Sequence, residues 1–135
     1  MTITFHPEPR MVLICNFDTG FQPPEMTKRR PVVVLSPRRH NAQTCIVVPL
    51  SSTPPVPPEA YHHLLEEASL PKELRHSPAW AKCNMIAAVA LDRLDRVRDG
   101  RDDLGRRKYV AKCVSDADFA AIRAAVQVAL GIGRP

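Results

Sequence analysis

The sequence predicts a mainly β (α+β) domain, in which short strands build a small, strongly bent sheet or barrel and a single helix follows at the C-terminus. Short runs rich in Val, Ile and Leu recur along the chain between Gly- and Pro-containing segments, as in small β folds. Helical periodicity occurs in the segment 115–131. With 135 residues, of which 44% are hydrophobic, the chain is long enough to bury one core, so we expect a single domain over residues 1–135.

The first half of the chain contains three predicted strands. Residues 11–17 form an apolar run, and the Gly and Pro residues of the segment 18–27 exclude a regular element directly after it. The second strand, 31–35, is rich in valine, and Pro31 fits its first position because no ladder donor is needed there. The third strand, 45–50, is also apolar. The connection of about nine residues allows the second and third strands to pair antiparallel.

The second half of the chain is less regular. The Pro-rich loop at 53–59 is expected to be semi-rigid and extended, as a mobile flap or as a plain linker. Charges and glycines interrupt the apolar pattern further along. The remaining predicted elements are a short strand or helical turn at 60–66, one or two strands at 79–90, a short turn or helix at 91–97, a charged loop or hairpin at 98–108 and a last strand at 109–114.

The C-terminal helix is the clearest element. Ser115 is a candidate N-cap, and Asp118 three residues later resembles a capping box with Asp in place of Glu. Gly131 is a natural stop. Helical spacing predicts one apolar face, made by Phe119, Ile122, Val126 and Leu130.

The charge of the chain favours an anionic partner. The formal net charge is +5 and the sequence pI is about 9.3, and nucleic acid is the commonest partner of such a protein. No apolar run approaches the roughly 20 residues of a membrane span. The N-terminus lacks the charged start and apolar centre of a signal peptide. We therefore expect a cytoplasmic protein with no membrane contact.

The cysteines and histidines do not predict a metal site. Cys15, Cys45, Cys83 and Cys113 are widely dispersed, without a Cys-x-x-Cys pair, and the five histidines show no ligand spacing. Three of the cysteines lie in apolar runs, where a free thiol behaves as a small buried hydrophobe. We expect no metal and no other cofactor.

Cations and hydroxyls are predicted to meet at one end of the sheet. Three cations, Lys28, Arg29 and Arg30, open the second strand, and three hydroxyl residues, Ser51, Ser52 and Thr53, close the third. In an antiparallel pair these two groups lie at the same end. An arginine held on a rigid strand can meet a phosphate in a set geometry, so the pair is a plausible phosphate site.

Four pieces of sequence stand in order along the chain: Phe17-Asp18 with Gly20 and Glu25, then Arg30 to Leu35, then Val47 to Ser52, and last Met85-Ile86 leading to Arg93-Leu94. Together they resemble PemK/MazF-type toxins, the mRNA interferases of type II toxin–antitoxin pairs. The resemblance extends over about residues 10–131. It implies an SH3-like β-barrel with a C-terminal helix, a homodimer, a cognate antitoxin, and sequence-selective cleavage of single-stranded RNA without metal.

The resemblance also assigns roles. It implies that Arg30 stabilises the charged phosphorane and that Ser51 stands at the position of the family's catalytic threonine, keeping the hydroxyl. Glu25 matches the acidic residue of the first loop, where it could accept a proton or orient Arg30 through an ion pair. Two further departures are Met85, where a polar residue such as Gln is common, and Arg10, where glycine is usual.

Neighbouring residues are predicted to bind RNA. Lys28 and Arg29 suit backbone phosphates, which give affinity without sequence choice. Phe21 is the better candidate for base stacking, because Trp80 lies inside a predicted strand and is expected in the core. Nothing in the sequence places His62 or His63 near Arg30. The predicted contacts also include Ser52 and Thr53, and Arg38, Arg39 and Arg75 could extend the surface or form an ordinary solvated face.

Two non-enzymatic alternatives remain open from the sequence. Toxins of the CcdB type resemble this family in fold but poison DNA gyrase instead of cutting RNA. A nucleic-acid-binding module that has lost activity is the other alternative, and the serine at position 51 keeps it open. The presence of both Arg30 and Ser51 favours the nuclease.

Overall fold

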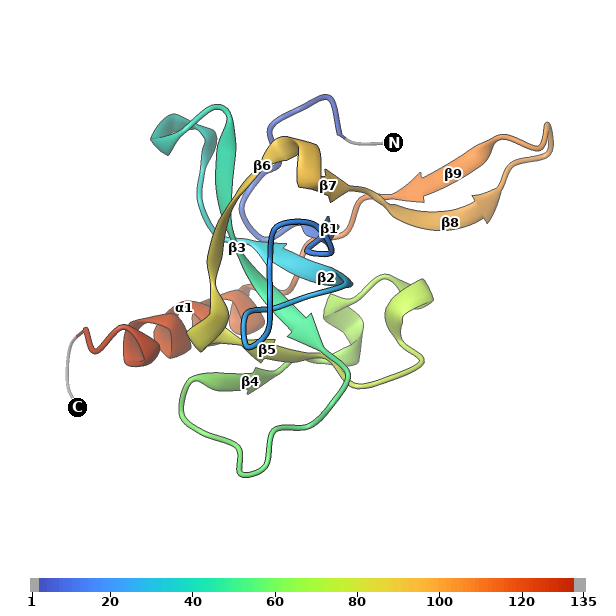
Figure 1. Cartoon of the computed structure of the whole chain (residues 1–135). Coiled ribbons are helices and arrows are strands. Elements are labelled where there is room, and N and C mark those ends of the chain that lie inside the picture. Colours follow the sequence, from blue (N-terminus) through green and yellow to red (C-terminus); the bar gives the residue numbers. More distant parts are fainter. Residues whose placement is uncertain (1–2, 133–135) are drawn as a thin grey trace.

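The computed structural model describes residues 3–132 and consists mainly of antiparallel strands with one long helix near the C-terminus (Figure 1). Five short 3-10 helices connect the strands: η1 (Arg38–His40), η2 (Glu67–Ser69), η3 (Lys72–Leu74), η4 (Cys83–Met85) and η5 (Leu91–Arg93). The strands are β1 (Val12–Asn16), β2 (Arg29–Val34), β3 (Thr44–Ser51), β4 (His62–Leu64), β5 (Trp80–Lys82), β6 (Ala87–Ala90), β7 (Leu94–Asp95), β8 (Val97–Arg101) and β9 (Arg107–Val110), and the helix is α1 (Asp116–Ala129).

The sheet is bent and open. Its paired strands follow the order β4-β5-β3-β2-β1-β7, and β6 pairs with β3 as well. The mainly β class with a C-terminal helix is therefore confirmed, although the strands of the described residues do not close into a barrel. Strand β3 is the centre of this arrangement, because β2, β5 and β6 all pair with it at different heights.

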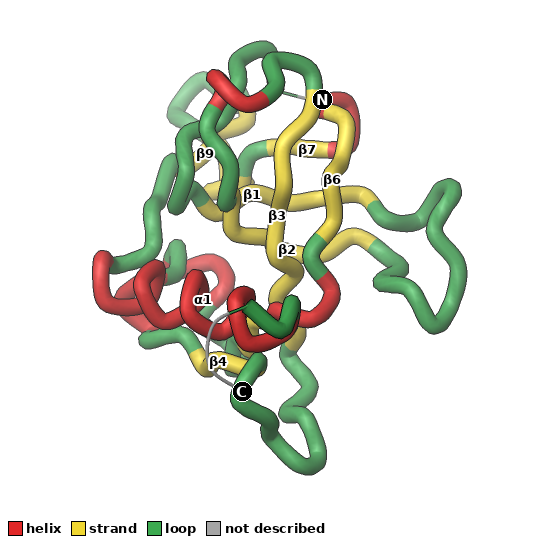
Figure 2. The backbone as a smooth tube through the Cα atoms, turned by 90° about the vertical axis from the view of Figure 1, so that its left-hand side faces the viewer, coloured by secondary structure: helices red, strands yellow, loops and turns green. Residues whose placement is uncertain are grey.

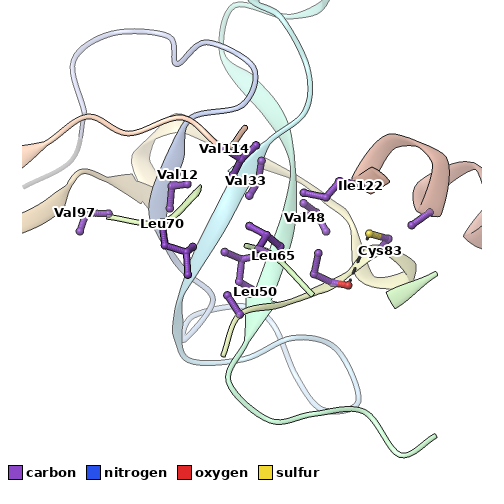
Figure 3. Close-up of a cluster of buried hydrophobic side chains, with 13 residues drawn as sticks. Val12, Val33, Val48, Leu50, Leu65, Leu70, Cys83, Val97, Val114 and Ile122 are labelled. Carbon is purple, nitrogen blue, oxygen red and sulfur yellow. Dashed lines mark hydrogen bonds between the residues drawn. The ribbon is translucent and has the colours of Figure 1, made fainter. Parts of the chain in front are cut away.

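The central strands are buried on both faces. For this reason their sequences are continuous apolar runs. Val33 and Val48 belong to one core cluster, which helix α1 covers through Ile122 (Figure 3). Val32 and Val47 belong to a second cluster on the opposite face. Figure 2 shows α1 lying beside the sheet near β4. Since the central strands are fixed from both sides, residues at their ends hold defined positions.

The helix confirms the predicted N-cap but only half of the capping box. Ser115 Oγ accepts the backbone N–H of Asp118 at 3.1 Å. The Asp118 carboxylate does not return to Ser115; the backbone N–H of Ser115 donates instead to Ser69 Oγ at 2.9 Å. The prediction that Leu130 lies on the apolar face is wrong, since Leu130 is 57% exposed at the helix end, while Ala125 is buried. Gly131 follows at φ +70°, as expected for a helix stop.

The segment after β7 is a two-stranded hairpin, β8 and β9, which projects from the sheet (Figure 1). The strand predicted at 109–114 begins earlier, at Arg107, and ends at Val110. For the charged segment 98–108 the hairpin alternative is confirmed, since it contains most of β8, the turn and the start of β9. Arg96 lies 3.9 Å from the ring centre of Tyr109, so cation–π packing supports the base of the hairpin.

Asp118 is the centre of a buried polar network that ties helix α1 to the segment after the Pro-rich loop. Its carboxylate accepts hydrogen bonds from Ser69 Oγ at 2.5 Å and from the backbone N–H of Glu66 at 2.9 Å, and it pairs with His63 Nε2 at 2.8 Å. The side chain is only 3% exposed. Burial alone raises the pKa of Asp118, but these hydrogen bonds outweigh burial and hold the pKa below its ordinary value.

This network predicts an acid-sensitive fold. Because the folded-state pKa of Asp118 lies below the ordinary 3.8, its contribution to stability is complete above that value and is lost as pH falls through the folded-state pKa. The urea midpoint of the wild type should therefore decrease on the acid side. In Asp118→Asn, which cannot titrate at this position, the decrease should be shallower. Urea titrations at a series of pH values compare the two, and parallel curves would contradict the prediction.

Arg10 stands where glycine is usual in the family, and its backbone conformation is one that favours glycine. Its backbone lies at φ +80°, the left-handed region in which glycine is free of strain. Its backbone N–H donates to Val34 O at 2.8 Å, and its side chain forms an ion pair with Asp116 at the start of α1. The arginine thus occupies a glycine-favouring turn while linking that turn to the helix.

Three of the four cysteines pack in the core, as expected. Cys15, Cys45 and Cys83 are buried free thiols, whereas Cys113 is exposed. Burial raises the pKa of Cys15 and Cys83 to about 12 and that of Cys45 to about 11, so these thiols stay protonated. Among the described residues, no helix is both long and apolar enough to cross a membrane.

Candidate active site

The antiparallel pairing of β2 with β3 brings the cations and hydroxyls together, as the sequence predicts. Val32 lies opposite Pro49 and Val33 opposite Val48. Continuing this register by two residues places Arg30 opposite Ser51. The paired residues end at Val32 and Pro49, so Arg30 and Ser51 lie two residues beyond the last pair, and both line one pocket.

A pocket of about 270 Å³ lies at this end of the sheet. Residues of three neighbouring strands line it: Ile14 of β1, Arg29 to Pro31 of β2, and Leu50 and Ser51 of β3. Its apolar side is formed by residues of the first core cluster, among them Leu50 and Leu70 (Figure 3). Its polar residues are Arg29, Arg30, Ser51, Ser52, His76 and Ser77.

The main chain of the first loop orients Arg30. The Nε–H of Arg30 donates to the carbonyl oxygen of Thr27 at 2.7 Å. Within residues 3–132 its two Nη nitrogens make no hydrogen bond, so both can donate to a bound anion. A guanidinium with one nitrogen fixed and two free donors is suited to a phosphate.

Ser51 is 8% exposed and occupies the last position of β3. Its Oγ accepts the backbone N–H of Thr53 at 3.2 Å, which leaves the hydroxyl proton available for a ligand. On its other side Ser51 lies opposite Trp80 of β5. Trp80 is partly exposed and belongs to neither core cluster, contrary to the expectation that it lies in the core. Trp80 is thus paired with Ser51 on the neighbouring strand, although it does not line the pocket.

Glu25 and Phe21 lie at a second pocket, which Met85 also lines. Of the two alternatives for Glu25, the ion pair with Arg30 is not formed; Glu25 Oε1 accepts the backbone N–H of Gln22 at 2.8 Å. The Phe21 ring packs edge-on against Phe17, with a centroid distance of 5.1 Å. The structure thus separates these two residues from the pair that the register aligns.

Arg93 holds the first loop in place. Its Nη1 donates to Asn16 O at 3.0 Å and to Thr19 O at 2.7 Å, and its guanidinium lies 4.8 Å from the Phe21 ring centre. Gly20 adopts φ +86°, and a Cβ there would lie 3.2 Å from Arg93 Nη2. Leu94 is fully buried, so Arg93-Leu94 has a structural role here.

The remaining predicted residues surround the pocket or lie apart from it. Lys28 and Thr53 are adjacent in the sequence to residues that line the pocket, and Arg38 and Arg39 belong to η1. His63 is engaged with Asp118, and His62 Nδ1 accepts the backbone N–H of Glu59 at 3.0 Å. Neither histidine lines the pocket.

Residues 70–79 form a wall of the pocket that the sequence does not predict. This segment contributes His76 and Ser77 opposite the strand ends. A usable signal was present in Leu65, Leu70 and Leu74, whose apolar side chains indicate that the segment packs against the core. Nothing local in the sequence, however, places it against β2.

A family model described as a PemK-like, MazF-like toxin of type II toxin–antitoxin systems matches residues 8–130. The chain belongs to this family. YifN of Escherichia coli (strain K12) is 31% identical over an alignment of 145 positions, which covers 93% of each chain.

Solved structures share the fold of this PemK/MazF-like toxin. A mycobacterial endoribonuclease in complex with its cognate antitoxin has a TM-score of 0.64 at 18% identity, and the match covers 96% of this chain and 100% of that one. MazF from Deinococcus radiodurans has a TM-score of 0.65 at 19% identity, with 95% and 99% covered. At these identities the likeness shows the fold alone.

Proposed function

We propose that this PemK/MazF-like toxin is an endoribonuclease that cleaves single-stranded RNA, including mRNA, at a short sequence and without metal. The observation that carries the proposal is that Arg30 and Ser51 line the same pocket. Mycobacterial structures of the same fold, with and without an antitoxin, are of an endoribonuclease, which supports the proposal. The basic pI of about 9.3 fits an anionic substrate.

The reaction follows from the groups in the pocket. The 2′-hydroxyl of the substrate attacks the adjacent phosphorus, the bond to the 5′-oxygen breaks, and the products carry a 2′,3′-cyclic phosphate and a 5′-hydroxyl. Arg30 remains protonated and stabilises the charge that develops on the phosphorane oxygens. Ser51 donates its hydroxyl proton to a phosphate oxygen. Both groups are held before substrate arrives, which is what such stabilisation requires.

RNA binding involves the surface around the pocket. Lys28 and Arg29 contact backbone phosphates, and Ser52 and Thr53 donate hydroxyl hydrogen bonds near the cleaved bond. Trp80 offers a partly exposed ring beside Ser51 for base stacking. Phe21 and Glu25 contact the RNA from the first loop, at the second pocket.

The direct test is cleavage of a varied pool of single-stranded RNA by purified protein in EDTA, with analysis of the product ends. Cleavage in EDTA with cyclic phosphate termini is the expected result. Cleavage that requires an added divalent ion would contradict the metal-free reaction. Salt-dependent RNA binding without any product would contradict the enzyme and favour the binding module.

Two substitutions of Ser51 are predicted to change the cleavage rate by different amounts. Ser51→Ala removes one donor aimed at the phosphate and should lower the cleavage rate by roughly 100-fold. Ser51→Thr restores the family's residue and should cleave close to the wild-type rate, because the hydroxyl is retained. Single-turnover rates of the three proteins on one RNA measure this. Equal rates for Ser51→Ala and the wild type would remove the serine from the mechanism.

Two assemblies belong to the proposal. The protein acts as a homodimer, and a cognate antitoxin blocks its RNA site; the antitoxin complex of the similar mycobacterial protein supports the second. A basic toxin surface suits an acidic, disordered antitoxin segment that folds on binding. Light scattering on the isolated protein tests the dimer, and a monomer at micromolar concentration would contradict it.

The free buried thiols fit a reducing, cytoplasmic setting.

A further inference from the structure

The proposed reaction needs a group that accepts the proton of the attacking 2′-hydroxyl. Arg30 stays protonated and cannot accept it. Ser51 Oγ already accepts the N–H of Thr53, and a serine hydroxyl is a poor base near neutral pH. Of the described residues that line the pocket, the ionisable ones are Arg29, Arg30 and His76. His76 is the one whose type changes charge between pH 5 and 8.

The geometry of His76 sets which ring nitrogen is free. Nδ1 lies 3.2 Å from the carbonyl oxygen of Glu73. A carbonyl can only accept, so Nδ1 carries the hydrogen, and in the neutral ring Nε2 holds the lone pair. The hydrogen bond to the main chain thus presents Nε2 as the basic atom of an exposed side chain at the pocket.

The segment that carries His76 is held firmly. Leu70 is 2% exposed, and its carbonyl accepts Arg75 Nε at 2.9 Å. The backbone N–H of Leu74 donates to Pro71 O at 2.9 Å. At its start, Ser69 is bound to the Asp118 carboxylate. The wall is therefore built before substrate binds, and His76 does not rely on a disordered loop for its position.

We propose that His76 is the general base of the RNA cleavage, an inference that rests on the proposed function. Nε2 of neutral His76 takes the proton of the 2′-hydroxyl while the O2′–P bond forms. The P–O5′ bond then breaks, and the 5′-oxygen takes a proton from solvent water at the open side of the pocket. His76 returns its proton to solvent, so the overall reaction consumes none. The charged residues that line this pocket with His76 are Arg29 and Arg30. His76 also lines an adjoining pocket, whose charged residues are Glu67 and Arg75.

His76→Gln tests the proposal, with His40→Gln as the matched control, because His40 is an exposed histidine on η1 away from the pocket. The expected result is a fall in kcat of about 100-fold or more for His76→Gln, with KM little changed. The wild-type rate should decrease toward acid pH as the base becomes protonated. This acid limb should disappear in His76→Gln and persist in His40→Gln. Added imidazole should restore part of the rate of His76→Ala.

The outcomes separate this inference from the proposed function. If the wild type cleaves and His76→Gln cleaves equally fast with the same acid limb, the base assignment is overturned while the nuclease stands. A rise in KM without loss of kcat also overturns it, since His76 would then only bind phosphate. If the wild type does not cleave at all, both fail. Circular dichroism of each variant checks folding, and affinity for an RNA with a 2′-deoxy residue at the cleavage position checks that the pocket still binds.

Discussion

Replacing Arg30 with alanine is expected to lower the rate of RNA cleavage by about a thousandfold or more, because a preorganised positive charge strongly stabilises a phosphoryl transition state. The wild-type Nε is already fixed on the Thr27 carbonyl, so the two Nη groups meet the phosphate with little loss of freedom. Arg30→Lys keeps the charge but loses the planar fork, and it should recover only part of the rate. Single-turnover cleavage of one RNA by the three proteins measures these differences.

Arg29→Ala is the matched control for Arg30. Both arginines line the same pocket and lie next to each other on β2. We expect Arg29→Ala to weaken RNA binding and to reduce the slope of log affinity against log salt by about 0.7, with a smaller effect on the single-turnover rate at saturation. Equal losses of rate in the two variants would show that the site needs general positive charge and not an oriented guanidinium.

Replacing Asp118 with alanine is expected to destabilise the fold by about 3 kcal/mol, which corresponds to a melting temperature lower by roughly 10 °C. The variant leaves Ser69, His63 and the backbone N–H of Glu66 without their acceptor in a buried place. Thermal and urea unfolding followed by circular dichroism measure the loss.

Asp116→Ala is the control for this second prediction. Asp116 is also a carboxylate in the first turn of α1, but its side chain is 89% exposed. An exposed ion pair with Arg10 and a favourable helix-terminus charge contribute about 1 kcal/mol or less. A similar loss of stability in Asp116→Ala and Asp118→Ala would show that the buried network around Asp118 contributes no more than the exposed ion pair does.

The elements that bring Arg30 to Ser51 could be predicted because their information is local. Two valine-rich runs joined by a short connection predict an antiparallel pair, and the positions of the cations and hydroxyls at the run ends then follow. The predicted ranges 31–35 and 45–50 differ from β2 and β3 by at most two residues at any end. Family resemblance added the roles of the two residues but not their surroundings.

The wall of the pocket could not be predicted, because its position depends on contacts distant in sequence. The segment 65–79 contains only single-turn helices, which lack periodicity. It is placed by Leu70 packing into the core and by the bond between Ser69 and Asp118, which lies 49 positions along the chain. For the same reason the sequence could not reveal that Glu25 faces a different pocket from Arg30.

The continuous ladder between β2 and β3 has a consequence for how this toxin can diverge. The alignment of Arg30 with Ser51 depends on the register of the strands and not on the segment 36–43 that joins them. Insertions or deletions in that connection can therefore accumulate without disturbing the pair. A one-residue deletion inside β3 would instead turn its side chains to the opposite face of the sheet. Length variation among descendants of this chain should thus concentrate at η1, while both strands keep their length.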